Sequence, residues 1–143
     1  MKILAIGNKS ITERLIMALV GSEFELIVTR ELSQAITPLE QEEFDLIVID
    51  SLANGVKAAC QYIRTFGDVP IVLMMSQREP DWEEIQSADL DGYIQRWVNG
   101  AELIACLRAM VRRFWPAQQF DRTTRHYLAP MVLNVTLRKP MSN

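Results

Sequence analysis

A single carboxylate stands at the end of an apolar run near the middle of the chain. The run FDLIVID covers residues 44–50 and closes with Asp50. The continuous stretch from Leu46 to Ile49 is typical of a strand that is buried on both faces of a parallel sheet. In such a sheet, ligands bind in the crevice outside the carboxyl ends of the strands. We therefore expect Asp50 to lie at the edge of the sheet where ligand-binding and catalytic residues usually lie.

The residues that follow the other predicted strands would share this edge of the sheet. They are Gly7, Asn8, Ser51, Met75, Ser76, Gln95 and Arg96. The segment AIGNKS after the first strand offers one glycine, and it matches neither GxGxxG nor a Walker motif. His126, the only histidine, lies in the tail, so no Ser/His/Asp set is available. A doubly wound enzyme that binds a nucleotide is therefore an alternative and not the preferred interpretation.

Five short apolar runs predict the strands that must position these residues. They cover residues 3–6, 24–28, 44–49, 69–75 and 91–95. Between and after them, apolar residues recur at helical spacing, for example at Ile11, Leu15 and Leu19. Strict alternation of strand and helix predicts a parallel sheet with helices on both faces and right-handed crossovers. The sequence therefore favours an α/β, doubly wound fold of five βα units.

The composition is that of one soluble, intracellular domain. The chain has 143 residues, of which 49% are hydrophobic and 23% charged. No apolar run approaches the roughly 18 residues that a membrane span needs. Met1 leads straight into the strand-like KILAI and not into a signal peptide. Cys60 and Cys106 lack metal-site spacing, and we expect two buried thiols in a cytoplasmic protein.

The last part of the chain differs from the rest in charge and pattern. Residues 112–143 hold six basic residues against one acid, a net charge of +5, which leaves −8 for the remainder. The charge can indicate a tail near nucleic acid or a solvated linker. Residues 114–130 lack a sustained period and are predicted to be a linker. Residues 131–139 alternate as a half-exposed strand does, and this strand must pair outside the core, in this chain or another.

The order of these elements, with Asp50 ending the third strand, resembles the receiver domain of two-component response regulators. The resemblance covers about residues 1–113, and the segment DGYIQRWVNGAELIACLRAMVRR (91–113) is similar to the family pattern DDYLxKPF…EEL…R. The matching positions are Asp91, Tyr93, Ile94, Glu102 and Leu103. The resemblance implies a CheY-like, flavodoxin-like fold with strand order 2-1-3-4-5 and makes Asp50 the phosphoacceptor candidate.

The positions that would bind a metal depart from the family pattern. The first strand of the family ends in two acids that hold Mg²⁺ with the phosphoacceptor, whereas this chain has Gly7 and Asn8. Mg²⁺ prefers oxygen ligands that include carboxylates. Only Asp50 and the amide oxygen of Asn8 would be available, so we expect weak Mg²⁺ binding and no other cofactor. The metal matters because the acceptor carboxylate must approach a phosphoryl group that is also negatively charged. A cation neutralises charge between these two anions.

Five further site residues also differ from the family pattern or are in doubt. The switch hydroxyl of the family falls on Met75, which cannot donate a hydrogen bond, and Ser76 is one place further along. Arg96 replaces a family lysine and could grip a phosphate or neutralise the acceptor carboxylate. Trp97 replaces a proline that forms a cis bond. Without its hydroxyl partner, Tyr93 is expected to be a fixed, half-buried aromatic.

These departures predict an atypical, degenerate receiver that regulates transcription through protein contacts and is not an enzyme. A conventional phosphorylation switch at Asp50 stays open as an alternative. Winged-helix regulators of the family dimerise through helix four, strand five and helix five. The candidates for this face are Trp82, Ile85, Leu90, Glu102, Leu107 and Arg108, although the apolar ones could equally be core.

The resemblance also implies partners. We expect a homodimer and, as a possible partner, a sensor kinase, with no membrane contact. Residues 131–143 resemble the opening strand of a winged-helix effector domain, and DNA would be reached only through the missing part of that domain. A stand-alone adaptor that docks a kinase or another receiver is a further alternative.

Overall fold

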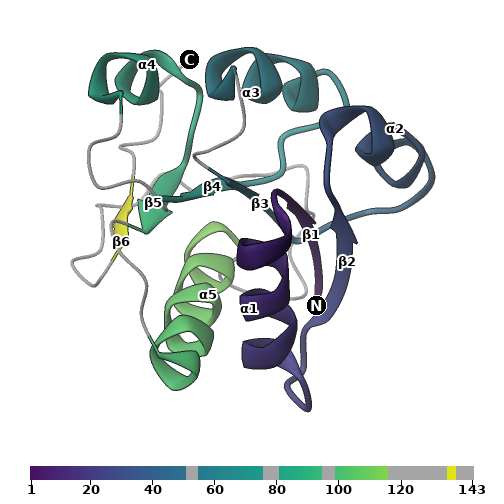
Figure 1. Ribbon diagram of the computed structural model, residues 1–143, viewed down its shortest axis with the longest axis vertical. Helices are drawn as coiled ribbons and strands as arrows, with labels where there is room; N and C mark the ends of the chain where they lie inside the picture. Colours follow the sequence, from purple (N-terminus) through teal and green to yellow (C-terminus); the bar gives the residue numbers. More distant parts are fainter. Residues whose placement is uncertain (51–54, 76–80, 95–98, 116–134, 138–143) are drawn as a thin grey trace.

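Strands and helices alternate along the part of the chain that the structure describes. The computed structural model describes residues 1–50, 55–75, 81–94, 99–115 and 135–137 (Figure 1). The strands are β1 (Lys2–Ile6), β2 (Glu25–Thr29), β3 (Leu46–Asp50), β4 (Ile71–Met74), β5 (Gly92–Ile94) and β6 (Val135–Leu137). The helices are α1 (Lys9–Leu19), α2 (Leu32–Gln41), α3 (Val56–Arg64), α4 (Trp82–Ser87) and α5 (Gly100–Phe114).

The sheet has the predicted order and one addition. Its strands lie in the order β2-β1-β3-β4-β5-β6, and the first five are parallel. The predicted doubly wound fold with order 2-1-3-4-5 is therefore confirmed. β6 is antiparallel and pairs with the outer edge of β5. The predicted strand at 131–139 thus contains a short strand that pairs with the sheet of its own chain.

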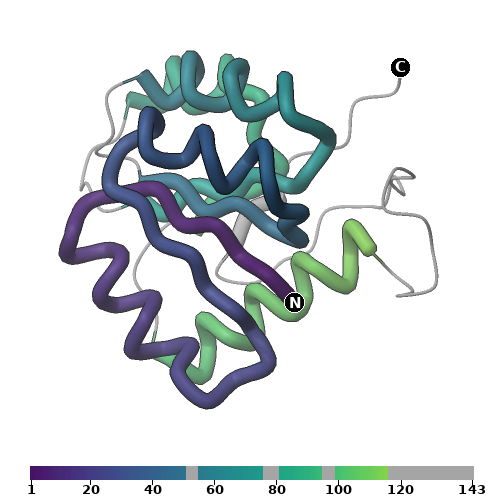
Figure 2. Tube along the Cα trace, turned by 90° about the vertical axis from the view of Figure 1, so that its right-hand side faces the viewer, coloured from purple at the N-terminus to yellow at the C-terminus, as the bar shows by residue number. Residues whose placement is uncertain are grey.

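The side chains of the central strand β3 pack into two separate hydrophobic cores, one on each face of the sheet. Leu46 and Val48 pack on one face with residues of α1 and α5, whereas Ile47 and Ile49 pack on the other with residues of α2, α3 and α4. The five helices lie in these two layers on either side of the sheet (Figure 2). This double burial explains why β3 shows no polar alternation.

Three of the helices begin with a side-chain cap. Asn8, Asp81 and Asn99 each accept a hydrogen bond from the backbone N–H three residues on, at 2.9–3.1 Å. Such a cap satisfies one of the free N–H groups of the first turn and stabilises a helix by about 1 kcal/mol. The cap of α1 also connects the end of β1 to the helix that follows it.

Arg64, at the end of α3, makes hydrogen bonds beside the amino ends of the strands, the edge of the sheet opposite to the carboxyl edge. Its guanidinium donates to the Asp91 carboxylate at 2.7 Å, to the Asp89 carboxylate at 3.0 Å and to the Val69 carbonyl at 2.6 Å. Asp91 also accepts from the backbone N–H of Ile71 at 2.8 Å. Because Asp91 is buried, the several donors are needed to offset its desolvation. The network joins α3 to the starts of β4 and β5.

Several residues predicted for a dimer face lie inside the fold instead. Ile85 (7% exposed), Leu90 (3%) and Leu107 (0%) are buried among the residues of the two cores. The sequence left two alternatives open for these residues, a dimer face or the core, and their burial supports the core. Helical spacing could not decide, because it marks an apolar face without showing what covers it. Of the remaining candidates, Trp82 is 44% exposed and Glu102 is exposed. Cys60 and Cys106 are buried thiols that are not joined in a disulfide, as predicted.

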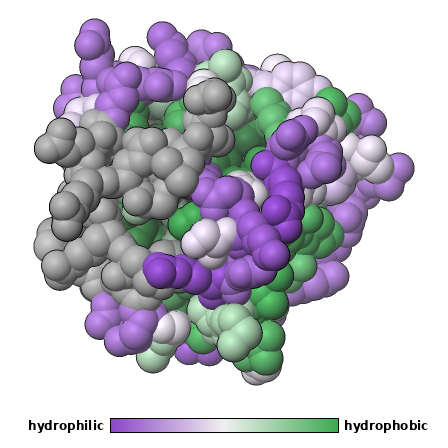
Figure 3. All heavy atoms as spheres, viewed as in Figure 1, coloured by the Kyte–Doolittle hydropathy of each residue, from purple (hydrophilic) through white to green (hydrophobic). Residues whose placement is uncertain are grey.

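Apolar side chains reach the surface on α1. Ile16, Met17 and Val20 are 43%, 78% and 73% exposed. In Figure 3, apolar spheres lie toward the lower end of this face, where Figure 1 has the second half of α1. Among the described residues, no helix has the length and apolar character needed to cross a bilayer. The predicted linker and the limits of the predicted domains lie largely outside the described residues and stay predictions.

A paired contact joins α5 to the loop between α1 and β2. Arg108 donates from Nε and Nη2 to the two carboxylate oxygens of Glu23, at 2.6 and 2.7 Å. The hydrogen bond from Arg108 lowers the pKa of Glu23 from 4.5 to about 2. Both side chains are nearly half exposed, so solvent screens the pair.

This contact predicts an acid-dependent part of the folding stability. Because the pKa of Glu23 is lower in the folded chain, its contribution is present above about pH 4.5 and is lost as the pH falls toward about 2. Glu23→Gln should therefore reduce the loss of stability between pH 5 and pH 2, measured as the shift of the urea midpoint. Glu40→Gln, at another exposed acid, should leave that shift unchanged. An unchanged pH dependence in Glu23→Gln would contradict the assignment.

Candidate functional site

Asp50 ends the central strand and is almost fully enclosed. It is 1% exposed and lies opposite Met74 of β4. The neighbouring β1 ends at Ile6, whose partner in β3 is Ile49, so Gly7 and Asn8 follow at the level of Asp50. The carboxylate, Gly7 and Asn8 are thus brought together as predicted. A carboxylate buried to this degree needs hydrogen-bond donors close to it.

Asn8 supplies such donors and caps α1 with the same side chain. Its Nδ2 donates to Asp50 Oδ2 at 2.6 Å, and its backbone N–H approaches the same oxygen at 3.3 Å. Its amide oxygen accepts from the backbone N–H of Ile11 at 3.0 Å. The cap requires the oxygen to face the helix, so the NH₂ group faces the carboxylate. One amide therefore connects the start of α1 to the candidate acceptor.

Gly7 allows β1 and β3 to end this close together. A Cβ built at Gly7 would lie 2.7 Å from the Cβ of Asp50, below any ordinary contact distance. The backbone N–H of Gly7 donates to the Thr29 carbonyl at 3.0 Å, which holds the segment in place beside β2. An acidic side chain at residue 7 would therefore need the backbone to move.

The described residues do not fit a magnesium site. The predicted ligand oxygen of Asn8 is already the acceptor of the helix cap, and its NH₂ group occupies one side of Asp50. No group of three or more His, Cys, Asp or Glu side chains that could hold a metal occurs in the described part of the chain. Mg²⁺ wants several oxygen ligands in near-octahedral arrangement, and the carboxylate of Asp50 alone does not supply them.

The other predicted site residues fall into two groups. Met75 is 7% exposed, and its backbone N–H donates to the Ile94 carbonyl at 3.1 Å. Tyr93 is half-buried, with its ring edge-on to Trp82 at 5.8 Å. Tyr93 is thus half-buried, as expected, and the roles of both residues at the site stay predictions. Ser76, Arg96 and Trp97 lie outside the described residues.

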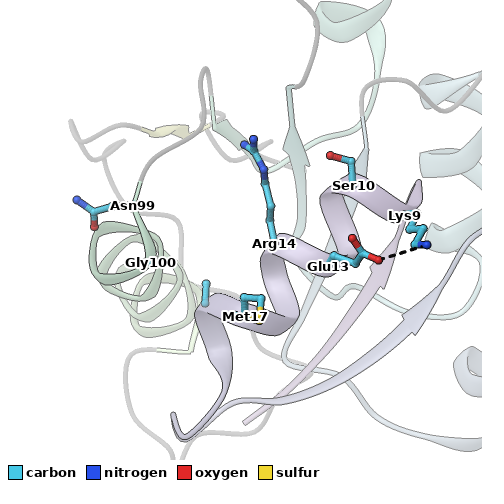
Figure 4. A pocket seen from close by; sticks show the side chains of 8 residues that line it. Lys9, Ser10, Glu13, Arg14, Met17, Asn99 and Gly100 are labelled. Carbon is cyan, nitrogen blue, oxygen red and sulfur yellow. Dashed lines mark ion pairs between the residues drawn. The ribbon is translucent and has the colours of Figure 1, made fainter.

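A groove between α1 and the start of α5 was not predicted from the sequence. It has a volume of about 790 Å³ and is lined by Lys9, Ser10, Glu13, Arg14, Met17, Ala18, Asn99 and Gly100 (Figure 4). Lys9 and Glu13 form an exposed ion pair at 3.7 Å on one wall. Arg14 and Met17 share that helical face, a pattern that the sequence does contain. The small residues at 18 and 100 allow the two helices to approach each other there.

Comparisons with known proteins place these features in a known context. No family model matches the chain. The DNA-binding response regulator MtrA of Mycolicibacterium smegmatis is 29% identical over 109 residues, 74% of this chain and 48% of the relative. The sensory transduction protein RegX3 of the same organism is 26% identical over 110 residues, with the same shares. The chain therefore spans about half the length of these curated relatives.

Solved structures share the fold. A two-component response regulator from Clostridium difficile has 24% identity and a TM-score of 0.65, over 78% of this chain and 96% of its own. The chemotaxis response regulator CheY4 of Vibrio cholerae has 21% identity and a TM-score of 0.59, over 76% and 96%. The receiver domain of the sensor histidine kinase PA1611 of Pseudomonas aeruginosa has magnesium coordinated in its active-site cleft. It has 19% identity and a TM-score of 0.63, over 77% of this chain and 96% of its own.

The close approach at Gly7 predicts the cost of a small substitution. Gly7→Ala should lower the free energy of unfolding by about 1–3 kcal/mol, because the added methyl group meets a rigid Cβ. Chemical denaturation would measure the loss. Gly100→Ala is the matched control, since its Cβ would meet Ala18 at 3.7 Å, an ordinary contact. Equal effects of the two substitutions would show that Asp50 does not constrain residue 7.

Proposed function

The chain is a receiver domain of the response-regulator type, and from that premise we propose that it signals through protein contacts, with weak or absent Mg²⁺-dependent phosphorylation of Asp50. The observation that carries the proposal is the hydrogen bond from the Asn8 amide to Asp50. This amide is neutral, so it satisfies the carboxylate without cancelling its charge. The amide therefore offers an approaching phosphoryl donor no positive charge.

The start of α1 supports the same reading. The amide oxygen of Asn8 caps α1, so turning the amide to offer that oxygen to a metal would give up the cap. The glycine before it leaves no room for an acid beside Asp50. Of the neighbouring folds, PA1611 has magnesium in its cleft. In this chain the residues that precede α1 act as a helix cap and a spacer instead.

A phosphate-driven change of state would also lack one of its usual contacts. Met75 offers no hydroxyl to a phosphoryl oxygen, and Tyr93 packs against Trp82. Inverting a 1:99 population of two states requires about 5.5 kcal/mol of differential interaction. With neither a metal nor a hydroxyl at these positions, we expect the phosphate to make few contacts that differ between two states.

We further propose that partners bind on the α1 side. Lys9 and Arg14 against Glu13 give one wall of the α1/α5 groove a net charge of +1, and the exposed Met17 adds apolar surface. A helix of a sensor kinase or of another signalling protein, with acids near an apolar stripe, would complement this groove. DNA contact is proposed only for an effector domain of the longer protein, as the name of MtrA implies for that relative.

The proposal predicts the outcome of a phosphorylation assay. The chain is incubated with acetyl phosphate and Mg²⁺, and its intact mass is measured beside an Asp50→Ala control. We expect no phosphoryl adduct in either sample. An adduct of about 80 Da that is absent from the control would show that Asp50 is a working acceptor and a conventional switch.

A single substitution should install metal binding. Asn8→Asp keeps a good helix cap and adds a carboxylate next to Asp50, so Mg²⁺ should raise the melting temperature of this variant. A ligand at 100 times its dissociation constant adds ~2.7 kcal/mol to stability. Asn8→Ser, which caps the helix without adding charge, is the matched control. A comparable Mg²⁺ effect on the unmodified chain would contradict the proposal.

A further inference from the structure

The helix α3 begins without a side-chain cap of its own. The residue before it, Gly55, lies in the left-handed region with φ 78° and ψ 50°. This backbone conformation favours glycine, because a side chain is strained at a positive φ. Glycine, however, has no side-chain oxygen that could accept from the first turn. The N–H groups that begin α3 therefore need an acceptor from another element or from water.

A carboxylate of the neighbouring helix supplies such an acceptor. Figure 1 shows α4 beside α3, and residues of both helices enter the same hydrophobic core. The backbone N–H of Lys57, in the first turn of α3, donates to Glu84 Oε1 at 3.4 Å. A negative charge at this end of a helix also interacts favourably with the helix dipole. The start of α3 is thus stabilised by a side chain that α4 holds in place.

The same turn of α4 also contacts β5. Trp82, the first residue of α4, lies with its ring edge-on to Tyr93, and the two ring centroids are 5.8 Å apart. Asp81 caps this turn by accepting from the backbone N–H of Glu84 at 3.1 Å. Because one capped turn carries both Trp82 and Glu84, a displacement of the ring also displaces the carboxylate.

We propose that the first turn of α4 is a relay between β5 and the start of α3, with Glu84 as the positioning residue. Trp82 is 44% exposed, so a protein that binds against its ring can reach the relay from outside. Such contact changes the position of Glu84 and, with it, the local stability of the first turn of α3, the helix that follows Asp50 in the chain. The relay requires neither phosphorylation of Asp50 nor a particular partner.

Amide hydrogen exchange at Lys57 measures the contact directly in the full chain. Glu84→Met keeps the side-chain length and helix propensity but removes the acceptor oxygen. Exchange at Lys57 should then rise about fivefold, the factor that corresponds to one hydrogen bond of ordinary net strength. Glu84→Gln keeps an acceptor oxygen and should restore most of the protection. Glu83→Met is the matched control, because Glu83 is an exposed acid in the same turn of α4.

A second substitution tests the relay itself. Trp82→Leu removes the ring contact with Tyr93, so exchange at Lys57 should rise in this variant and should rise no further when Glu84→Met is added. Additive effects would overturn the proposal, as would unchanged exchange at Lys57 in either single variant or an equal rise in Glu83→Met. Exchange in α1 is followed in the same samples. A rise of equal size there would reveal a loss of global stability and would also overturn the relay.

Discussion

Burial of β3 on both faces is the constraint on which the rest of the site depends. The strand lies between β1 and β4, and its side chains enter two cores, so its last residue has little access to water. A buried carboxylate in that position needs hydrogen-bond donors from the residues that follow the neighbouring strands. Here Asn8 is one such donor, and the tight approach of the two strand ends is possible because residue 7 is glycine.

The same amide connects local and long-range structure. At one end it completes the first turn of α1, and at the other it stabilises a charge at the end of a different strand. In a site built from acids, these two tasks would belong to separate groups. Their combination in one side chain means that a change at residue 8 affects helix and carboxylate together. The site is thus held by a small set of direct contacts.

The sequence was sufficient for the fold and for part of the site. Alternation of apolar runs and helical spacing predicted a doubly wound parallel sheet, and the family resemblance implied its strand order. The run before Asp50 predicted the buried position of this residue at the carboxyl end of its strand. The sequence did not show that Ile85, Leu90 and Leu107 are core residues, because helical periodicity marks an apolar face without showing what packs on it. The pairing of β6 with β5 was open for a similar reason, since an alternating pattern specifies a strand but not its neighbour. The direction of the Asn8 amide emerges only from tertiary contacts.

The end of α5 is anchored to the amino edge of the sheet. The Trp115 indole N–H donates to the Asp45 carbonyl at 3.0 Å, and the Asp45 carboxylate accepts from the backbone N–H of Lys2 at 2.8 Å. α5 thus begins beside the carboxyl edge of the sheet and finishes anchored at its amino edge, after 15 residues, or about 22 Å. One continuous helix therefore connects Asn99, its cap at the carboxyl edge, with the contact that Trp115 makes at the amino edge.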